Sequence, residues 1–227
     1  MYKGNKTQTQ RFSISVPRAS YIADAFVRFS CRLKMDPAEI VYMETNSQMA
    51  IRNILNSDYR LGIIRYAVEH EEYFAQLLRE KNLSGRLISE FTYELIMSRD
   101  NEIAKKEKIY WTDLNDFIEI THGDPYLPLM TLDAMHCTVQ EQAERRILLF
   151  ERGGQFDLLC ENKQTYMWVS PLPPHLLTRY SLVQRKCEDN KRVYRDMLVR
   201  NKNYQLTKLD EMFLEELKTS KKNAGIG

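Results

Sequence analysis

A strict alternation of polar and apolar side chains runs through residues 11–16, RFSISV, and ends at Pro17. Because successive side chains of a β-strand point to opposite faces, this alternation predicts a strand with one polar and one apolar face. Arg11, Ser13 and Ser15 lie on its polar face. One short strand is not stable by itself, so the chain must fold in a way that gives this strand a partner.

Two helices are expected directly after the strand. Apolar residues recur at helical spacing within residues 18–34, at Ile22, Phe26, Phe29 and Leu33. Asp36 followed by Pro37 is typical of a helix start, which predicts a second helix that runs from there toward Leu55. The predicted order within residues 1–57 is therefore strand, helix, turn and helix.

The rest of the chain, residues 58–227, reads mostly as helices. The apolar spacing indicates five helical segments, at 63–81, 87–108, 114–120, 132–145 and 175–202. Thr207 and Asp210 are expected to open a last helix. This part of the chain is predicted to form one helical domain, separate from the domain at residues 1–57.

A small β-region is expected near residues 147–170. Runs of strand-forming residues occupy 147–151, 156–161 and 165–170, and turn residues such as Gly153 and Gly154 separate the first two. These runs predict a three-stranded antiparallel meander. The predicted fold class is therefore mainly α, with a small meander in the second domain.

Charge is balanced over the whole chain but not along it. The 33 lysines and arginines face 31 acidic residues, whereas residues 1–35 contain seven basic residues and one acidic residue, Asp24. A basic amino-terminal segment favours an anionic partner. No stretch is apolar enough for a membrane span, and the four cysteines lack metal-ligand or disulfide spacing, so a cytoplasmic protein that does not enter a membrane is expected.

The sequence predicts no catalytic residue, no metal site and no cofactor. His136 and Cys137 are residue types that serve in nucleophilic catalysis, but no second motif accompanies them. His70, Glu71 and Glu72 lack the spacing of a zinc-protease helix and indicate a solvated helix face. A function other than catalysis is therefore expected.

The amino-terminal residues resemble the ribbon-helix-helix family of DNA-binding proteins. The family pattern is a strand of the form Arg-apolar-Ser/Thr-apolar-Ser/Thr-apolar followed by two helices, and residues 11–16 match its strand at six consecutive positions. The resemblance implies a homodimer whose two strands form a β-ribbon in the major groove of double-stranded DNA. It implies base contacts by Arg11, Ser13 and Ser15, and flanking or phosphate contacts by Lys6, Thr9, Gln10 and Arg18.

The function that this resemblance implies is sequence-specific regulation of transcription. A short DNA-binding segment with a large helical body is also similar to plasmid-encoded regulators of conjugation, which implies an activator of plasmid conjugation genes. The body would then mediate assembly or contact RNA polymerase or another regulator. Two alternatives stay open: an antitoxin that represses its own toxin–antitoxin pair, and a helical adaptor that does not bind DNA.

Overall fold

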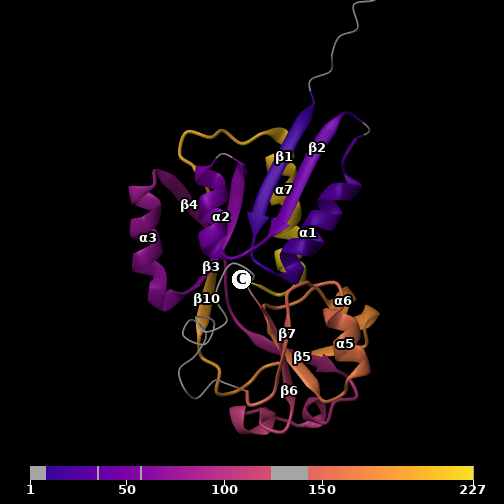
Figure 1. The fold of residues 1–227 in the computed structure, drawn as a ribbon. Helices are drawn as coiled ribbons and strands as arrows, with labels where there is room; N and C mark the ends of the chain where they lie inside the picture. Colours follow the sequence, from indigo (N-terminus) through magenta and orange to yellow (C-terminus); the bar gives the residue numbers. More distant parts are fainter. Residues whose placement is uncertain (1–8, 35, 57, 124–142, 227) are drawn as a thin grey trace, which may run out of the picture. The chain divides into compact units, whose positions relative to one another are not determined.

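The computed structural model describes residues 9–34, 36–56, 58–123 and 143–226, which fall into two compact units (Figure 1). Unit 1 lies within residues 1–90 and 194–227, and unit 2 within residues 91–193. The chain therefore enters unit 2 and returns to unit 1. The domain boundary expected at residue 57 falls inside unit 1.

The fold class is α/β, so the expectation of a mainly α protein is wrong. Each unit contains a five-stranded mixed sheet. The sheet of unit 1 has the order β2 (Ala38–Glu44), β1 (Gln10–Val16), β3 (Leu61–Ala67), β10 (Val193–Asn201) and β4 (Leu83–Thr92). Within it, β1 pairs in parallel with both β2 and β3, while β10 runs antiparallel to β3.

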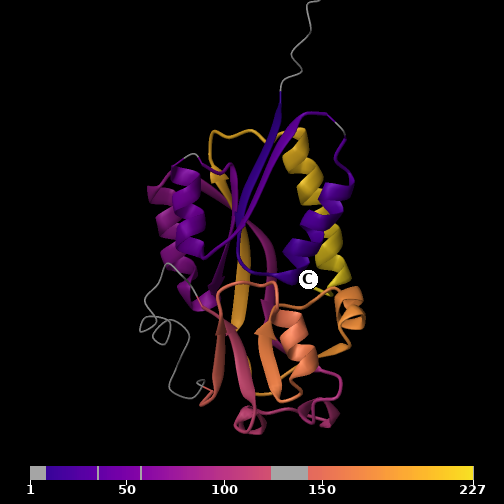
Figure 2. The same cartoon turned by 45° about the vertical axis from the view of Figure 1, so that its right-hand side comes forward.

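Helices cover both faces of the sheet of unit 1 (Figure 2). On one face lie α1 (Ser20–Cys31) and α7 (Lys208–Asn223), and on the other lie α2 (Ser47–Leu55) and α3 (Glu71–Glu80), the latter preceded by a 3-10 turn at Val68–His70. The first face is closed by an aromatic cluster, in which the ring of Phe12 lies 4.7 Å from that of Phe29 and 5.3 Å from that of Phe213. On the second face, a Cβ at Gly62 would lie 2.7 Å from Ile54 Cδ1, so glycine allows α2 to approach β3 closely.

Predictions for the amino-terminal segment are partly confirmed. The strand and the first helix form as β1 and α1. The second helix is wrong over residues 38–44, which form strand β2, and it begins only at Ser47. Residues 38–44 contain Ile40, Val41 and Tyr42, side chains that favour a pleated sheet, and pairing along the whole of β1 overrides the helix-start signal at Asp36 and Pro37.

The sheet of unit 2 has the order β7 (Arg146–Leu149), β6 (Ile118–His122), β8 (Thr165–Val169), β5 (Glu94–Ser98) and β9 (Leu182–Arg185). Strand β6 pairs in parallel with β7 and β8, and β5 pairs antiparallel with β8 and β9. Within the described residues of this unit, the helices are α5 (Gln155–Glu161) and α6 (Pro174–Arg179), and 3-10 turns form at Ile103–Lys105 and Trp111–Leu114.

The expected meander is wrong in its middle element and in its pairing. Residues 156–161 belong to helix α5, and β6 separates the two runs that do form strands, β7 and β8. Gly153 and Gly154 precede α5 instead of closing a hairpin. The two glycines mark a chain reversal correctly, but the pairing of β7 depends on a strand that comes earlier in the chain.

Several of the predicted helices in residues 58–227 are also wrong. Strands occupy much of 87–108 and 175–202 and the end of 114–120, whereas the helix predicted at 63–81 is confirmed over 71–80 as α3 and is wrong only at its start, which belongs to β3. The last helix is confirmed as α7, whose first turn is closed by hydrogen bonds between Thr207 and Asp210 in a capping box. Most of the helix expected at 132–145 lies outside the described residues. Within the described ranges, no helix combines the length and apolar character that a bilayer crossing needs.

Candidate functional site

The three residues expected to contact DNA bases do not form an exposed ribbon. Strand β1 lies inside its own sheet, and its polar side faces α2. The Ser15 side chain is fully buried and accepts a hydrogen bond from Asn53 Nδ2 at 3.1 Å, while Ser13 Oγ accepts one from the backbone N–H of Arg60 at 3.1 Å. Arg11 is exposed, and its Nε lies 3.1 Å from a carboxylate oxygen of Glu39 on the neighbouring strand β2. The ribbon-helix-helix arrangement is therefore wrong.

The flanking residues are dispersed. Thr9 and Gln10 are exposed at the amino end of β1, whereas Arg18 is half-buried in the connection between β1 and α1, at the other end of the strand. Lys6 lies outside the described residues. Contacts of these four residues and of Arg11 with DNA stay predictions.

A different site is indicated where the parallel strands of unit 1 end. The chain passes from β1 to β2 on one side of β1 and then to β3 on its other side, so the strand order reverses between β1 and β3. Ligands of open α/β sheets bind beyond the carboxyl ends of the strands at such a switch point. At this edge lie Arg18, Ser20, Thr45, Asn46 and Ser47, which we call the carboxyl edge of unit 1.

The start of α1 lacks a side-chain cap. Its N-cap is Ala19, whose methyl group accepts no hydrogen bond, and its first turn contains no acidic residue. The first amides of a helix have no acceptor within the helix. Their partial positive charge at the carboxyl edge therefore favours an anionic group.

The start of α2 lies beside the start of α1. The backbone N–H of Thr45 donates to the carbonyl of Val16 at 2.8 Å, which joins the carboxyl ends of β2 and β1. Asn46 caps α2 by accepting from the Met49 N–H at 2.7 Å, and the first turn of α2 again has no acidic residue. Two helix starts without acidic residues thus meet at one edge of the sheet.

Thr45 supplies the most informative side chain of the carboxyl edge. It is 5% exposed, and its hydroxyl has no hydrogen-bond partner within the part of the chain that the structure describes. An unpaired buried hydroxyl costs about 1–3 kcal/mol of desolvation. Such a group indicates a position where a ligand or an ordered water completes the structure.

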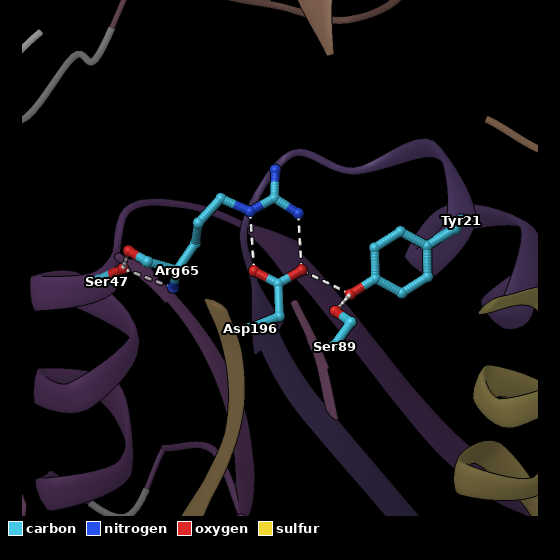
Figure 3. Close-up of polar contacts among 5 residues, drawn as sticks. All are labelled: Tyr21, Ser47, Arg65, Ser89 and Asp196. Atoms are coloured by element: carbon cyan, nitrogen blue, oxygen red, sulfur yellow. Dashed lines mark hydrogen bonds and ion pairs between the residues drawn. The ribbon is translucent and has the colours of Figure 1, made fainter. Parts of the chain in front are cut away.

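A buried polar network holds this edge in place (Figure 3). Arg65 of β3 donates to both carboxylate oxygens of Asp196 on β10, at 2.7 Å each, and Tyr21 of α1 donates to the same carboxylate at 2.5 Å. The Tyr21 hydroxyl also lies 3.0 Å from Ser89 Oγ. Ser47 Oγ accepts from the N–H of Arg65 and donates to its carbonyl, so the start of α2 is fixed to β3.

Burial also fixes the role of the Tyr21 hydroxyl in this network. Burial, and then the nearby Asp196 carboxylate, raise the pKa of Tyr21 well above its ordinary value. The phenol therefore stays protonated and donates to Asp196. The bidentate pair of Arg65 and Asp196 is fully enclosed, with side chains 8% and 0% exposed. The network links α1, α2, β3 and β10, and so sets the relative position of the two helix starts.

Among the residues of unit 2 that the structure describes, Glu119 has a strongly changed pKa. Burial raises the pKa of Glu119 on β6 to about 7, against the opposing effect of Arg146 on the neighbouring strand. His122, at the end of β6, lies 2.9 Å from Gln155 Oε1 through Nε2. Across the described ranges of both units, no three His, Cys, Asp or Glu side chains form a group able to hold a metal ion.

Solved structures with a similar fold are regulatory domains. The effector binding domain of QuiR in complex with shikimate is 14% identical, with a TM-score of 0.59, and the match covers 94% of this chain and 98% of that chain. The regulatory domain of MetR, a LysR family regulator from N. meningitidis, is 12% identical, with a TM-score of 0.61 and coverages of 93% and 94%. The Synechocystis PCC6803 CcmR regulatory domain in complex with 2-PG is 18% identical, with a TM-score of 0.61 and coverages of 95% and 99%.

These similarities establish the fold. They overturn the ribbon-helix-helix prediction and give no support to the resemblance to plasmid-encoded conjugation regulators. No protein-family model and no curated protein match the sequence.

The residues of the carboxyl edge carry the sequence signal of a strand-to-helix junction. Thr45, Asn46 and Ser47 follow directly after a strand, and three consecutive residues that favour helix caps are typical of a strand-to-helix junction. Ser20 follows β1 in a similar way. The error in the second helix concealed the junction between β2 and α2, because it placed Thr45 inside a helix.

Proposed function

We propose that this chain is a ligand-sensing domain of a transcription regulator and that unit 1 binds a small carboxylate-bearing molecule at its carboxyl edge. The observation that carries the proposal is the buried, unpaired hydroxyl of Thr45 beside the uncapped start of α1. A carboxylate would accept hydrogen bonds from the Thr45 hydroxyl and from the first amides of α1. Arg18, in the same connection, adds positive charge.

The charge distribution supports an anion in preference to a neutral ligand. The first turns of α1 and α2 contain no acidic residue, whereas the first turn of α3 contains Glu71 and Glu72. An anion near the carboxyl edge therefore meets two favourable helix starts. The Asp196 carboxylate is enclosed and engaged by Arg65 and Tyr21, so its charge is neutralised within the network.

The similar folds support a regulatory role. The QuiR domain is described in complex with shikimate, a carboxylate, and the CcmR domain in complex with 2-PG. We propose that this chain likewise responds to a small molecule without transforming it. We also propose that the regulator acts in the cytoplasm as a homodimer on double-stranded DNA. Light scattering tests whether the protein is a homodimer, and gel-shift measurements test whether it binds double-stranded DNA.

The test of the site is a thermal-shift screen of small carboxylates, shikimate among them, followed by calorimetric titration of any that stabilise the protein. A ligand at one hundred times its Kd should raise the unfolding free energy by about 2.7 kcal/mol. In the Thr45→Val variant the affinity should fall about tenfold, as expected for loss of a hydrogen bond to a charged group. The amides of Tyr21 and Ile22 should become protected from hydrogen exchange when the ligand binds.

The stability of the free protein supplies a second readout. Removal of the unpaired Thr45 hydroxyl should raise the unfolding free energy by about 1 kcal/mol, because the cost of burying it disappears. A matched control is Thr165→Val in unit 2, since the buried Thr165 hydroxyl donates to the carbonyl of Asn162 at 2.7 Å. That change should lower the unfolding free energy by about 1 kcal/mol. Unchanged carboxylate affinity in Thr45→Val would refute the site, as would a screen without any binder.

A further inference from the structure

A groove lies at the opposite edge of the unit 1 sheet, where β1 and β3 begin. Its volume is about 530 Å³. Among the described residues, seven line it, from the starts of β1 and α7 and the residue before β3: Thr9, Gln10, Arg11, Arg60, Thr207, Lys208 and Leu209. We call it the amino-edge groove. Because β1 and β3 are parallel, both their amino ends lie at this edge, and the carboxyl edge is at the other end of the same strands.

The groove combines three cations with a helix start. Arg11, Arg60 and Lys208 come from three different elements and converge on one volume. Lys208 has no ion pair or hydrogen-bond partner for its side chain among the described residues. Lys208 and Leu209 are also the first two residues of α7. The capping box engages the backbone N–H of Asp210, which follows them, so the N–H groups of Lys208 and Leu209 have no acceptor within the helix.

Contacts within the chain hold both arginines of the groove in place and leave some of their guanidinium N–H groups for another acceptor. Arg60 Nη1 lies 3.5 Å from the carbonyl of Arg11, and its guanidinium lies 6.0 Å from the ring centroid of Tyr204. These contacts leave most of the five N–H donors of Arg60 for another acceptor. Arg11 uses Nε for its exposed pair with Glu39, the acidic side chain nearest to it in register.

The first turn of α7 contains two acidic residues, Asp210 and Glu211. Asp210 is fully buried, and its Oδ2 accepts from the Tyr204 hydroxyl, the Thr207 hydroxyl and the Thr207 N–H, while its Oδ1 has no hydrogen-bond partner among the described residues. Among the described residues, the lining of the groove itself contains no acidic residue. Of its three cations, Arg11 is paired with Glu39, and Arg60 and Lys208 add positive charge.

From this juxtaposition we infer that the amino-edge groove binds the phosphate group of a small molecule. Guanidinium forks and helix amides are the groups that bind phosphate in proteins, and several donors from separate elements suit its three oxygens. The volume lies within the range of small-molecule sites. A bounded groove with converging cations favours a small phosphate compound over duplex DNA, whose contacts need cations spread along a surface. This inference does not depend on the carboxylate site.

The test is a calorimetric titration of the full chain with pyrophosphate, inorganic phosphate and acetate at constant ionic strength. Pyrophosphate should bind most tightly, with shifts in the amide signals of Lys208 and Leu209. Lys208→Gln should weaken it about tenfold, since the change removes one charged contact. Lys208 is exposed, so folding should be unaffected, and an unchanged melting temperature checks this.

The matched control is Lys218→Gln, an exposed lysine ten residues further along α7, about 15 Å away along the helix axis. It should bind pyrophosphate like the wild type. Equal weakening in both variants would indicate only general attraction to a basic surface and would overturn the inference. The absence of pyrophosphate binding would overturn it too, and so would Lys208-dependent binding of a short DNA duplex in preference to pyrophosphate.

Discussion

Replacement of Asp196 by asparagine should be among the most damaging single changes in unit 1. Asp196 is fully buried and accepts two hydrogen bonds from Arg65 and one from Tyr21. Asparagine keeps the shape but removes the charge, and its amide N–H₂ group must face either a guanidinium or a phenol that also donates. The Arg65 guanidinium would then be a buried charge without its counter-ion.

Removal of one partner of a buried ion pair costs about 3–5 kcal/mol. With a urea dependence of about 2 kcal/mol per molar, a loss of about 4 kcal/mol lowers the unfolding midpoint of unit 1 by about 2 M. Both tryptophans, Trp111 and Trp168, lie in unit 2, so their fluorescence does not report on unit 1 directly. Hydrogen exchange of the β3 and β10 amides during urea titration is the suitable assay.

Two further variants make this prediction specific. Glu90→Gln removes the partner of an exposed pair with Arg195, the neighbour of Asp196 on β10, and should leave the midpoint unchanged. The double change of Arg65 and Asp196 to methionine should recover most of the loss, because an apolar pair avoids the buried charge. A midpoint shift below about 0.5 M in Asp196→Asn would refute the reasoning.

Three other predictions concern packing, pH and surface charge. Phe213→Ala should lower the unfolding free energy by about 3–5 kcal/mol, measured by circular dichroism in urea, because it empties the centre of the aromatic cluster. Glu119 binds its proton more tightly in the folded state, so it should reduce the stability of unit 2 as pH rises from about 4.5 to about 7. Tryptophan fluorescence in urea should show this slope, and Glu119→Gln should remove it. Arg32→Gln breaks only exposed pairs and should leave the urea midpoint unchanged.

The sequence predicts those helices and strands of unit 1 that have one polar and one apolar side. Strand β1 alternates from Arg11 to Val16 and α1 has one apolar stripe, so periodicity identifies both, while the capping residues Thr207 and Asp210 identify the start of α7. Residues 61–67 carry no such signal, because β3 is central and its residues are buried or half-buried throughout. A short apolar run of this kind fits a buried strand or a helix equally well.

Interpretation of the polar residues of β1 failed for a related reason. The alternation shows that Ser13 and Ser15 differ from their neighbours, but not whether water or a second layer covers them. In this fold α2 covers them, and Asn53 supplies the partner for Ser15. The candidate site depends on still more distant relations, since Arg65 meets a carboxylate 131 residues further along the chain.

The return of the chain to unit 1 has a consequence for biosynthesis. Strand β10 lies between β3 and β4. The sheet of unit 1 therefore lacks one of its inner strands until the ribosome has made residues 193–201. By then the whole of unit 2, a continuous segment, has been translated and is free to fold on its own. A nascent chain that stalls before residue 194 would hold Arg65 without its carboxylate and β3 with an open edge. Such chains are natural substrates for chaperones and proteases, and unit 1 should therefore be the last part of the protein to mature.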